Sequence, residues 1–352
     1  MMRIFKRIFT LAAVAVLSMT ALGSCMESRK PVDIEKKASS RLERLPGIIC
    51  WGGSIMYGTY GKGKSIKKSI ENHMMEDECY IPVVSRSVPR ETTQTILARA
   101  GAVKVTVDAF TIPQDCEAVD VTLITSDKSK ITPLRYNARC DGGMRNVTIA
   151  GVEGYLEMDS ETAKFEDPIY MFTRKEPGDE VKVKKGEQVI SESMTEYKDY
   201  IPVICMGEDG EWNNDPKKLI EQQKAIINAG DSKDKYVIIG LFSATATEED
   251  AKLNEDEYQE TLLKRSQELD NAMQKQWGDH YVNIRECLCS DSTLKKIEES
   301  GLEITDEDRE NMKKGIVPDV LKSSQYFLNG YAYDIIGDAV YDKMVKLGYL
   351  YH

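Results

Sequence analysis

Short apolar runs that alternate with amphipathic segments predict an α/β fold. The runs at 47–51 and 81–84 have the length and composition of buried parallel strands. Segments with helical spacing and mixed charge follow at 65–75 and 91–98. The order strand, helix, strand, helix predicts a three-layer fold with a doubly wound parallel sheet.

The pattern changes between residues 103 and 200. Runs rich in β-branched residues, such as 119–124 and 146–150, are separated by turn sequences such as Asp141-Gly142-Gly143. No helical periodicity of useful length occurs in this stretch. We therefore expect an all-β insertion of roughly a hundred residues at 103–200.

The α/β pattern resumes after residue 200. An apolar run at 201–206 precedes a helix that opens at Asp215-Pro216, where proline suits the first turn. Further elements are expected as a strand at 236–241, a charged helix at 250–277, a strand at 281–284, helical segments within 291–314 and a helix at 333–347. The α/β domain is thus expected in two parts, 45–102 and 201–352.

The amino-terminal segment 1–24 has the composition of an export signal. A basic start precedes the apolar run 8–22, which is short for a membrane span. Its end, Leu22-Gly23-Ser24-Cys25, resembles a bacterial lipoprotein signal, which implies that Cys25 becomes the lipid-modified first residue. An ordinary signal peptide and an uncleaved anchor are the alternatives. With a polar tether at 25–44, we expect a protein anchored by its lipid to the outer face of a bacterial membrane.

Charge limits the classes of partner. The chain has a formal net charge of -11, and removal of 1–24 would lower it by three. Such an acidic protein lacks the electrostatic footprint of a nucleic-acid binder, so neutral or cationic partners are favoured. The three histidines lie at no ligand spacing from a cysteine, and neither metal nor cofactor is expected. A weaker alternative is a cation site at Glu208, Asp209, Glu211 and Asp215.

The cysteines leave several possibilities open. Cys50 and Cys205 lie in apolar runs typical of buried thiols. Cys116 and Cys140 could pair within the insertion, and Cys287-Leu288-Cys289 could be redox active. Unpaired structural cysteines are the simpler interpretation.

Two distant segments carry a family resemblance. Cys50-Trp51-Gly52-Gly53-Ser54 and 324–329 resemble the first and last signature blocks of SGNH (GDSL-type) esterases, most closely bacterial lipoproteins with a β insertion. In the family's Gly-Asp-Ser block the serine is the nucleophile, and it corresponds to Ser54. Gly53 stands where the family has aspartate. The register set by Leu328-Asn329 places Phe327 at the base histidine and Ser324 at its aspartate.

The resemblance also implies three oxyanion donors, of which two are altered. The N–H of Ser54 is one, and a turn at 87–90 should give the second from a glycine. Pro89 has no N–H, and Arg90 carries a side chain where the backbone must approach closely, so loss of this donor is expected unless a one-residue shift leaves the Arg90 amide in place. The third donor, an asparagine amide, is Asp209, whose carboxylate only accepts.

These departures favour a catalytically inactive protein. We expect a lipid-anchored surface protein that keeps the esterase-like frame as a binding site or scaffold, with a glycan, an acyl ester or a surface protein as partner. The alternative is an active serine esterase on carbohydrate or lipid esters, which uses Ser54 with an atypical base. His73, His280 and Tyr326 are poor substitutes for that base, and the sequence leaves enzymatic activity open.

Overall fold

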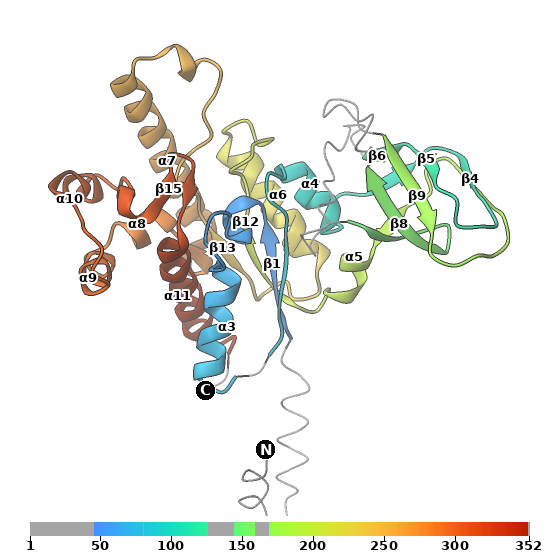
Figure 1. Ribbon diagram of the computed structural model, residues 1–352, viewed down its shortest axis with the longest axis horizontal. Helices are drawn as coiled ribbons and strands as arrows, with labels where there is room; N and C mark the ends of the chain where they lie inside the picture. The colour runs from blue at the N-terminus through green and yellow to red at the C-terminus, as the bar shows by residue number, and fades with distance from the viewer. Residues whose placement is uncertain (1–45, 80, 126–143, 159–168, 351–352) are drawn as a thin grey trace, which may run out of the picture. The chain divides into compact units, whose positions relative to one another are not determined.

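The computed structural model describes residues 46–79, 81–125, 144–158 and 169–350 (Figure 1). The residues from Pro46 onward form one compact unit. The expected leader at 1–24, the tether at 25–44 and the lipidation site at Cys25 lie outside the described residues. Within the described ranges, no helix combines the length and apolar character that a membrane crossing requires.

A five-stranded parallel sheet forms the centre of the α/β domain. Its order is β14 (Tyr281–Val282), β13 (Val237–Ile239), β12 (Ile201–Cys205), β1 (Ile48–Gly52) and β2 (Val83–Ser87). Every residue of β1 and β12 is buried, as their continuous apolar sequences predict for strands covered on both faces. The prediction of an α/β fold with a parallel sheet is confirmed.

The direction in which the chain adds strands reverses between β1 and β12. The chain first places β2 beside β1, and after the insertion it adds β12 on the other side of β1. The loops after these two strands start side by side and then run to opposite faces of the sheet, which leaves room for a site between them. This reversal fixes where function is expected in the sheet.

Local sequence signals set the main helices. In α3 (Ile66–Glu76), the Ser65 side chain accepts a hydrogen bond from the Lys68 N–H, and Asp215 caps α6 (Pro216–Ala229) in the same way. Helix α3 packs against α11 (Gly330–Lys346), and both lie to one side of β1 and β12 in Figure 1, with α4 (Thr93–Arg99) and α6 on the other. The other helices are α2 (Ser54–Tyr57), α5 (Glu192–Glu196), η1 (Asp250–Lys252), α7 (Glu255–Trp277), η2 (Gly278–His280), α8 (Ile284–Leu288), α9 (Asp291–Glu299), α10 (Asp306–Lys313) and η3 (Asp319–Leu321).

Two expected elements are divided. The predicted helix at 250–277 is wrong at its start, because Asn254 caps α7 with a reciprocal bond to Glu257 and separates it from η1. The β-branched run at 119–124 forms two strands, β5 (Val119–Val121) and β6 (Leu123–Thr125). The two pair with different partners, which the uniform β-branched composition did not indicate.

The segment between the two parts of the sheet is β-rich. One antiparallel sheet has the order β11 (Val189–Ser191), β7 (Asn146–Ile149), β8 (Val152–Met158), β9 (Tyr170–Arg174) and β5. Two pairs accompany it, β3 (Val105–Val107) with β6 and β4 (Phe110–Ile112) with β10 (Val181–Val183). A separate apolar core fills this segment. Cys140 lies outside the described residues, so the possible pairing of Cys140 with Cys116 is not described.

Helix α4 connects this β-rich segment to the parallel sheet. Ala98 belongs to the core of the β-rich segment, while Ile96 and Leu97 belong to the core around the sheet. The Ser191 hydroxyl at the end of β11 donates to the Arg99 carbonyl at 3.3 Å. Helix α4 is therefore shared between both cores.

Candidate functional site

The loops after β1 and β12 meet at the carboxyl edge of the parallel sheet. Gly52 and Cys205 are paired at the ends of the two strands, so Gly53-Ser54 and 206–209 leave the sheet side by side. Ser54 begins helix α2, and its side chain is buried. In open α/β sheets, a ligand site is expected at this reversal of strand order.

The Ser54 hydroxyl is held from two sides. The backbone N–H of Arg90 donates to Ser54 Oγ at 3.0 Å, and the hydroxyl makes a long hydrogen bond of 3.5 Å to Asp209 Oδ2. Pro89 offers no donor, but the following amide takes that place. The loss of a donor from this turn, expected from the sequence, is therefore not observed.

Arg90 reaches this position with an unusual backbone. Its φ is +64°, in the left-handed region that glycine adopts more readily than arginine. Of the seven other described non-glycine residues with positive φ, five lie in the segments that follow β1 and β12, namely Tyr60, Lys62, Glu211, Asn213 and Asn214, and the other two are Glu78 and Ala150. Such conformations gather at functional sites because the surrounding structure must maintain them. The carboxyl edge of the sheet thus has the backbone character of a functional site.

Glu208 occupies the amino end of helix α2. Its Oε1 accepts the N–H of Ile55 at 3.0 Å, while its Oε2 is buried and has no hydrogen-bond partner. Burial, and after it the neighbouring Asp209, raise the pKa of Glu208 to about 8. Sequence reasoning gave Glu208 only a minor role as a cation ligand. The signal available was its position three residues after the end of a buried strand that pairs with β1.

The Glu208 carboxyl lies in the space that a side chain at position 53 would use. A Cβ built on Gly53 would meet Glu208 Oε1 at 2.8 Å and Asp209 Oδ2 at 3.2 Å. Contacts under 3.0 Å require a shift of one partner. The absence of a side chain at Gly53 therefore allows both acidic side chains to converge on this turn.

Phe327 and Ser324 lie in a hairpin formed by β15 (Lys322–Ser324) and β16 (Phe327–Leu328). The Phe327 ring meets the edge of Tyr60 with centroids 4.8 Å apart. Ser324 is exposed. A phenyl ring accepts no proton, so this hairpin supplies no base at position 327.

The two described histidines have structural partners elsewhere. His73 Nε2 lies 2.8 Å from Asp338 Oδ1, and its ring stacks on Tyr341. His280 stacks on Tyr236, with centroids 4.2 Å apart. These contacts support packing roles for both side chains.

The four acidic residues after β12 do not form one cluster. Glu211 accepts a hydrogen bond from the Thr92 hydroxyl at 2.6 Å, and Asp215 caps helix α6. In the described part of the chain, no three acidic, histidine or cysteine side chains form a group that could hold a metal ion. The expected alternative of a four-residue cation site is therefore wrong.

Burial keeps the cysteines at positions 50, 205, 287 and 289 in the thiol form. Burial raises the pKa of Cys50 to about 12, and burial also raises that of Cys205. Burial raises the pKa of Cys287 and of Cys289 to about 11, so both remain thiols at neutral pH. The thiols at 287 and 289 therefore do not support a redox centre.

Exposed tyrosines lie on the segments next to the site. Tyr57 ends helix α2, Tyr60 follows it, and Tyr326 lies at the tip of the β15–β16 hairpin, with 38%, 59% and 63% of their surface exposed. The Phe327 contact joins Tyr60 to the hairpin. We call Tyr57, Tyr60 and Tyr326 the tyrosine rim.

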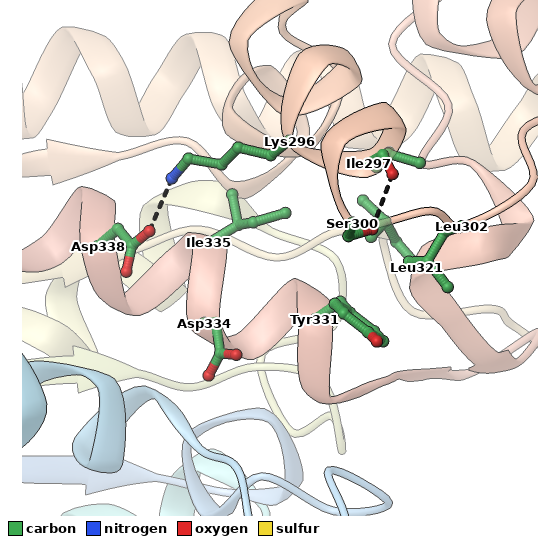
Figure 2. Close-up of a pocket in the computed structure, with 9 residues that line it drawn as sticks. All are labelled: Lys296, Ile297, Ser300, Leu302, Leu321, Tyr331, Asp334, Ile335 and Asp338. Atoms are coloured by element: carbon green, nitrogen blue, oxygen red, sulfur yellow. Dashed lines mark hydrogen bonds and ion pairs between the residues drawn. The ribbon is translucent and has the colours of Figure 1, made fainter.

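A separate cavity of about 170 Å³ lies between α9, η3 and α11 (Figure 2). Its walls are Lys296, Ile297, Ser300, Leu302, Leu321, Tyr331, Asp334, Ile335 and Asp338. Figure 2 shows Lys296 extended toward Asp338, at 2.7 Å, and Asp334 is paired with Lys64 at 2.5 Å. Both carboxylates that line this cavity are already paired with lysines. They are therefore less available to a ligand than the polar groups around Ser54.

Comparisons with known proteins give no match: no family model, no curated protein and no solved structure is similar to this chain.

Proposed function

We propose that this chain is a lipid-anchored surface protein which uses an SGNH-type esterase frame for binding rather than for hydrolysis. The strand order β2-β1-β12-β13-β14 is the order of flavodoxin-like doubly wound sheets, which agrees with such a three-layer frame. The observation that carries the proposal is the Glu208 carboxyl at the amino end of α2. Its Oε1 accepts the N–H of Ile55, directly next to the Ser54 N–H that an oxyanion would need, and so places an acidic group beside that donor.

The surroundings of Ser54 oppose ester hydrolysis in two ways. A serine esterase needs a base that removes the hydroxyl proton, and donors that stabilise the negative charge of the tetrahedral intermediate. Position 327 carries no base, and Asp209 brings a carboxylate to the place where negative charge would develop. Loss of one oxyanion donor already lowers the rate by about 10²–10³.

A ligand site at this edge is supported by the half-buried Asp209 and by the tyrosine rim. Tyrosine presents a ring face for apolar contact and a hydroxyl for hydrogen bonding. Glycans, acyl esters and the surface of another protein are the partner classes that such a rim suits. The lipid on Cys25 would hold this site at the outer face of the membrane.

One contact favours a second candidate, a serine esterase with Asp209 as its base. The 3.5 Å separation between Ser54 Oγ and Asp209 Oδ2 is close to the reach of proton transfer. An aspartate has an ordinary pKa of about 3.9, which makes it a weak base at neutral pH. Turnover by this route would depend on both residues.

Hydrolysis assays separate the two candidates. Purified full-chain protein is incubated with p-nitrophenyl acetate and with acetylated oligosaccharides, alongside Ser54→Ala, Asp209→Asn and the control Ser324→Ala. We expect equal release from all four proteins, at the level of buffer alone. Turnover that is lost in both Ser54→Ala and Asp209→Asn, but kept in Ser324→Ala, would establish the esterase and overturn the binding proposal.

A further inference from the structure

The ligand class of the Ser54 site is indicated by an oxygen atom that the protein leaves unsatisfied. Glu208 Oε2 is buried without a hydrogen-bond partner, although Oε1 of the same carboxyl is bonded to Ile55. An unsatisfied buried oxygen costs free energy that a hydrogen-bond donor would recover. The chain thus retains an acceptor for a donor that it does not itself supply.

The second carboxylate gives this acceptor an electrostatic preference. Asp209 Oδ2 and Glu208 Oε1 both converge on Gly53. Two neighbouring carboxyl groups disfavour each other's ionisation, and a positive charge between them removes that penalty. Glu208 and Asp209 are each partly exposed as whole residues, although the Oε2 atom of Glu208 is itself buried.

The tyrosine rim supplies aromatic rings on the segment that follows Ser54 in the chain and on the hairpin that contacts it. An ammonium group binds favourably over the face of an aromatic ring, and the tyrosine ring is one of those that bind it. Tyr60 and Tyr326 are more than half exposed, so their rings are available to a ligand. The net charge of -11 also draws cations toward the protein.

We propose that the Ser54 site binds an organic ammonium ion, with its charged nitrogen at Glu208 and Asp209 and its carbon body against the tyrosine rim. This inference rests on the proposed binding function of the same site and names the class of its ligand. The ammonium group donates to Glu208 Oε2 and offsets the charge of the carboxyl pair. A neutral alcohol of the same shape supplies the donor without the charge.

Benzylamine and benzyl alcohol provide the matched probes, because they share a ring and differ in charge at neutral pH. Calorimetric titration of the full-chain protein is expected to give at least tenfold tighter binding of the amine. Glu208→Gln and Asp209→Asn should each weaken amine binding at least tenfold and leave alcohol binding unchanged. The control Asp319→Asn, an exposed carboxylate remote in sequence, should bind the amine as the parent does.

The pH dependence gives an independent readout. The titratable groups that face Glu208 are Asp209, Cys205 and Tyr333, and the last two remain neutral between pH 6 and 8 because burial raises their pKa. Amine binding to ionised Glu208 releases its proton, so affinity should rise by up to about tenfold per pH unit in this range. Alcohol binding should stay constant.

Each outcome decides the inference. Equal affinity for both probes, absence of amine binding, or amine binding that survives both carboxamide variants would overturn it. Thermal melting of each variant shows whether it is folded, and the two variants are independent of each other. Failure here leaves the binding proposal standing, since that proposal is overturned only by Ser54-dependent hydrolysis.

Discussion

The backbone N–H of Arg90 points at the side chain of Ser54, with 3.0 Å between the nitrogen and Oγ. The contact joins the turn after β2 to the first residue of α2, and it is made by a residue in the left-handed conformation. A backbone donor does not depend on the identity of the side chain. Its geometry nevertheless depends on how easily that residue adopts a positive φ.

Substitution of Arg90 by glycine should stabilise the protein. The left-handed region costs a residue with a Cβ about 1–2 kcal/mol, which glycine avoids at the expense of a more flexible unfolded chain. We expect Arg90→Gly to raise the free energy of unfolding by about 0.5–1 kcal/mol in urea titrations. Arg90→Ala keeps the Cβ and serves as the control, with little change expected. Equal stability of the two variants would contradict the strain at this position.

A methyl group on Gly53 should destabilise the protein through Glu208. Its Cβ would approach Glu208 Oε1 to 2.8 Å, and overpacking of this kind costs about 1–3 kcal/mol. In a Glu208→Ala background, the same Gly53→Ala change should lose most of this penalty. Chemical denaturation of the four proteins in this double-mutant cycle measures the coupling. A coupling energy near zero would show that the two positions do not compete for space.

Glu208 should make stability fall as pH rises. Its pKa is raised from about 4.5 in the unfolded chain to about 8, so the folded state holds a proton that the unfolded state has released between these values. The contribution is fully present below pH 4.5 and is lost as pH approaches 8, at up to about 1.4 kcal/mol per unit. Glu208→Gln should flatten the profile of unfolding free energy between pH 5 and 8. A parent and variant with parallel profiles would rule out this titration.

The buried ion pair between Glu91 and Arg99 should be essential for the turn that carries Arg90. Both side chains are almost fully buried, and Arg99 also donates to the Arg86 carbonyl at the end region of β2. Removal of one partner leaves a buried charge, which costs about 3–5 kcal/mol, so Glu91→Ala should lower the thermal melting temperature strongly. Asp319→Ala removes the exposed partner of Lys322 and should cost at most about 1 kcal/mol. Similar losses from both variants would contradict a structural role for the buried pair.

The strands and the starts of the helices could be predicted from the sequence because local chemistry determines them. The buried runs of β1 and β12 can only be covered strands, and Ser65 and Asp215 mark helix starts through their side-chain oxygens. The second strand was expected at 81–84 but lies at 83–87, because its pairing with β1 extends to Ser87. Pairing partners decide strand ends, and a single sequence does not display them.

The candidate site could be only partly predicted, because its contacts join residues that are distant in the sequence. The position of Ser54 followed from the resemblance of residues 50–54 to the first esterase block, at the end of a buried strand. The role of Glu208 did not, since it depends on contact with a residue 153 positions away in the chain. The sequence left open whether the Arg90 amide remains in place, because composition does not reveal a left-handed backbone at an arginine.

The close approach of Glu208 to Gly53 also constrains the evolutionary history of this protein. If an ancestor carried an aspartate at position 53, as the esterase resemblance implies, that side chain had to be lost before Glu208 could settle where it lies. The reverse path now meets the opposite order, because a new aspartate would collide with Glu208 and add a third carboxylate. A return to aspartate would therefore need the Glu208 side chain to move or to be replaced, so the residues at positions 53 and 208 are expected to change together during evolution.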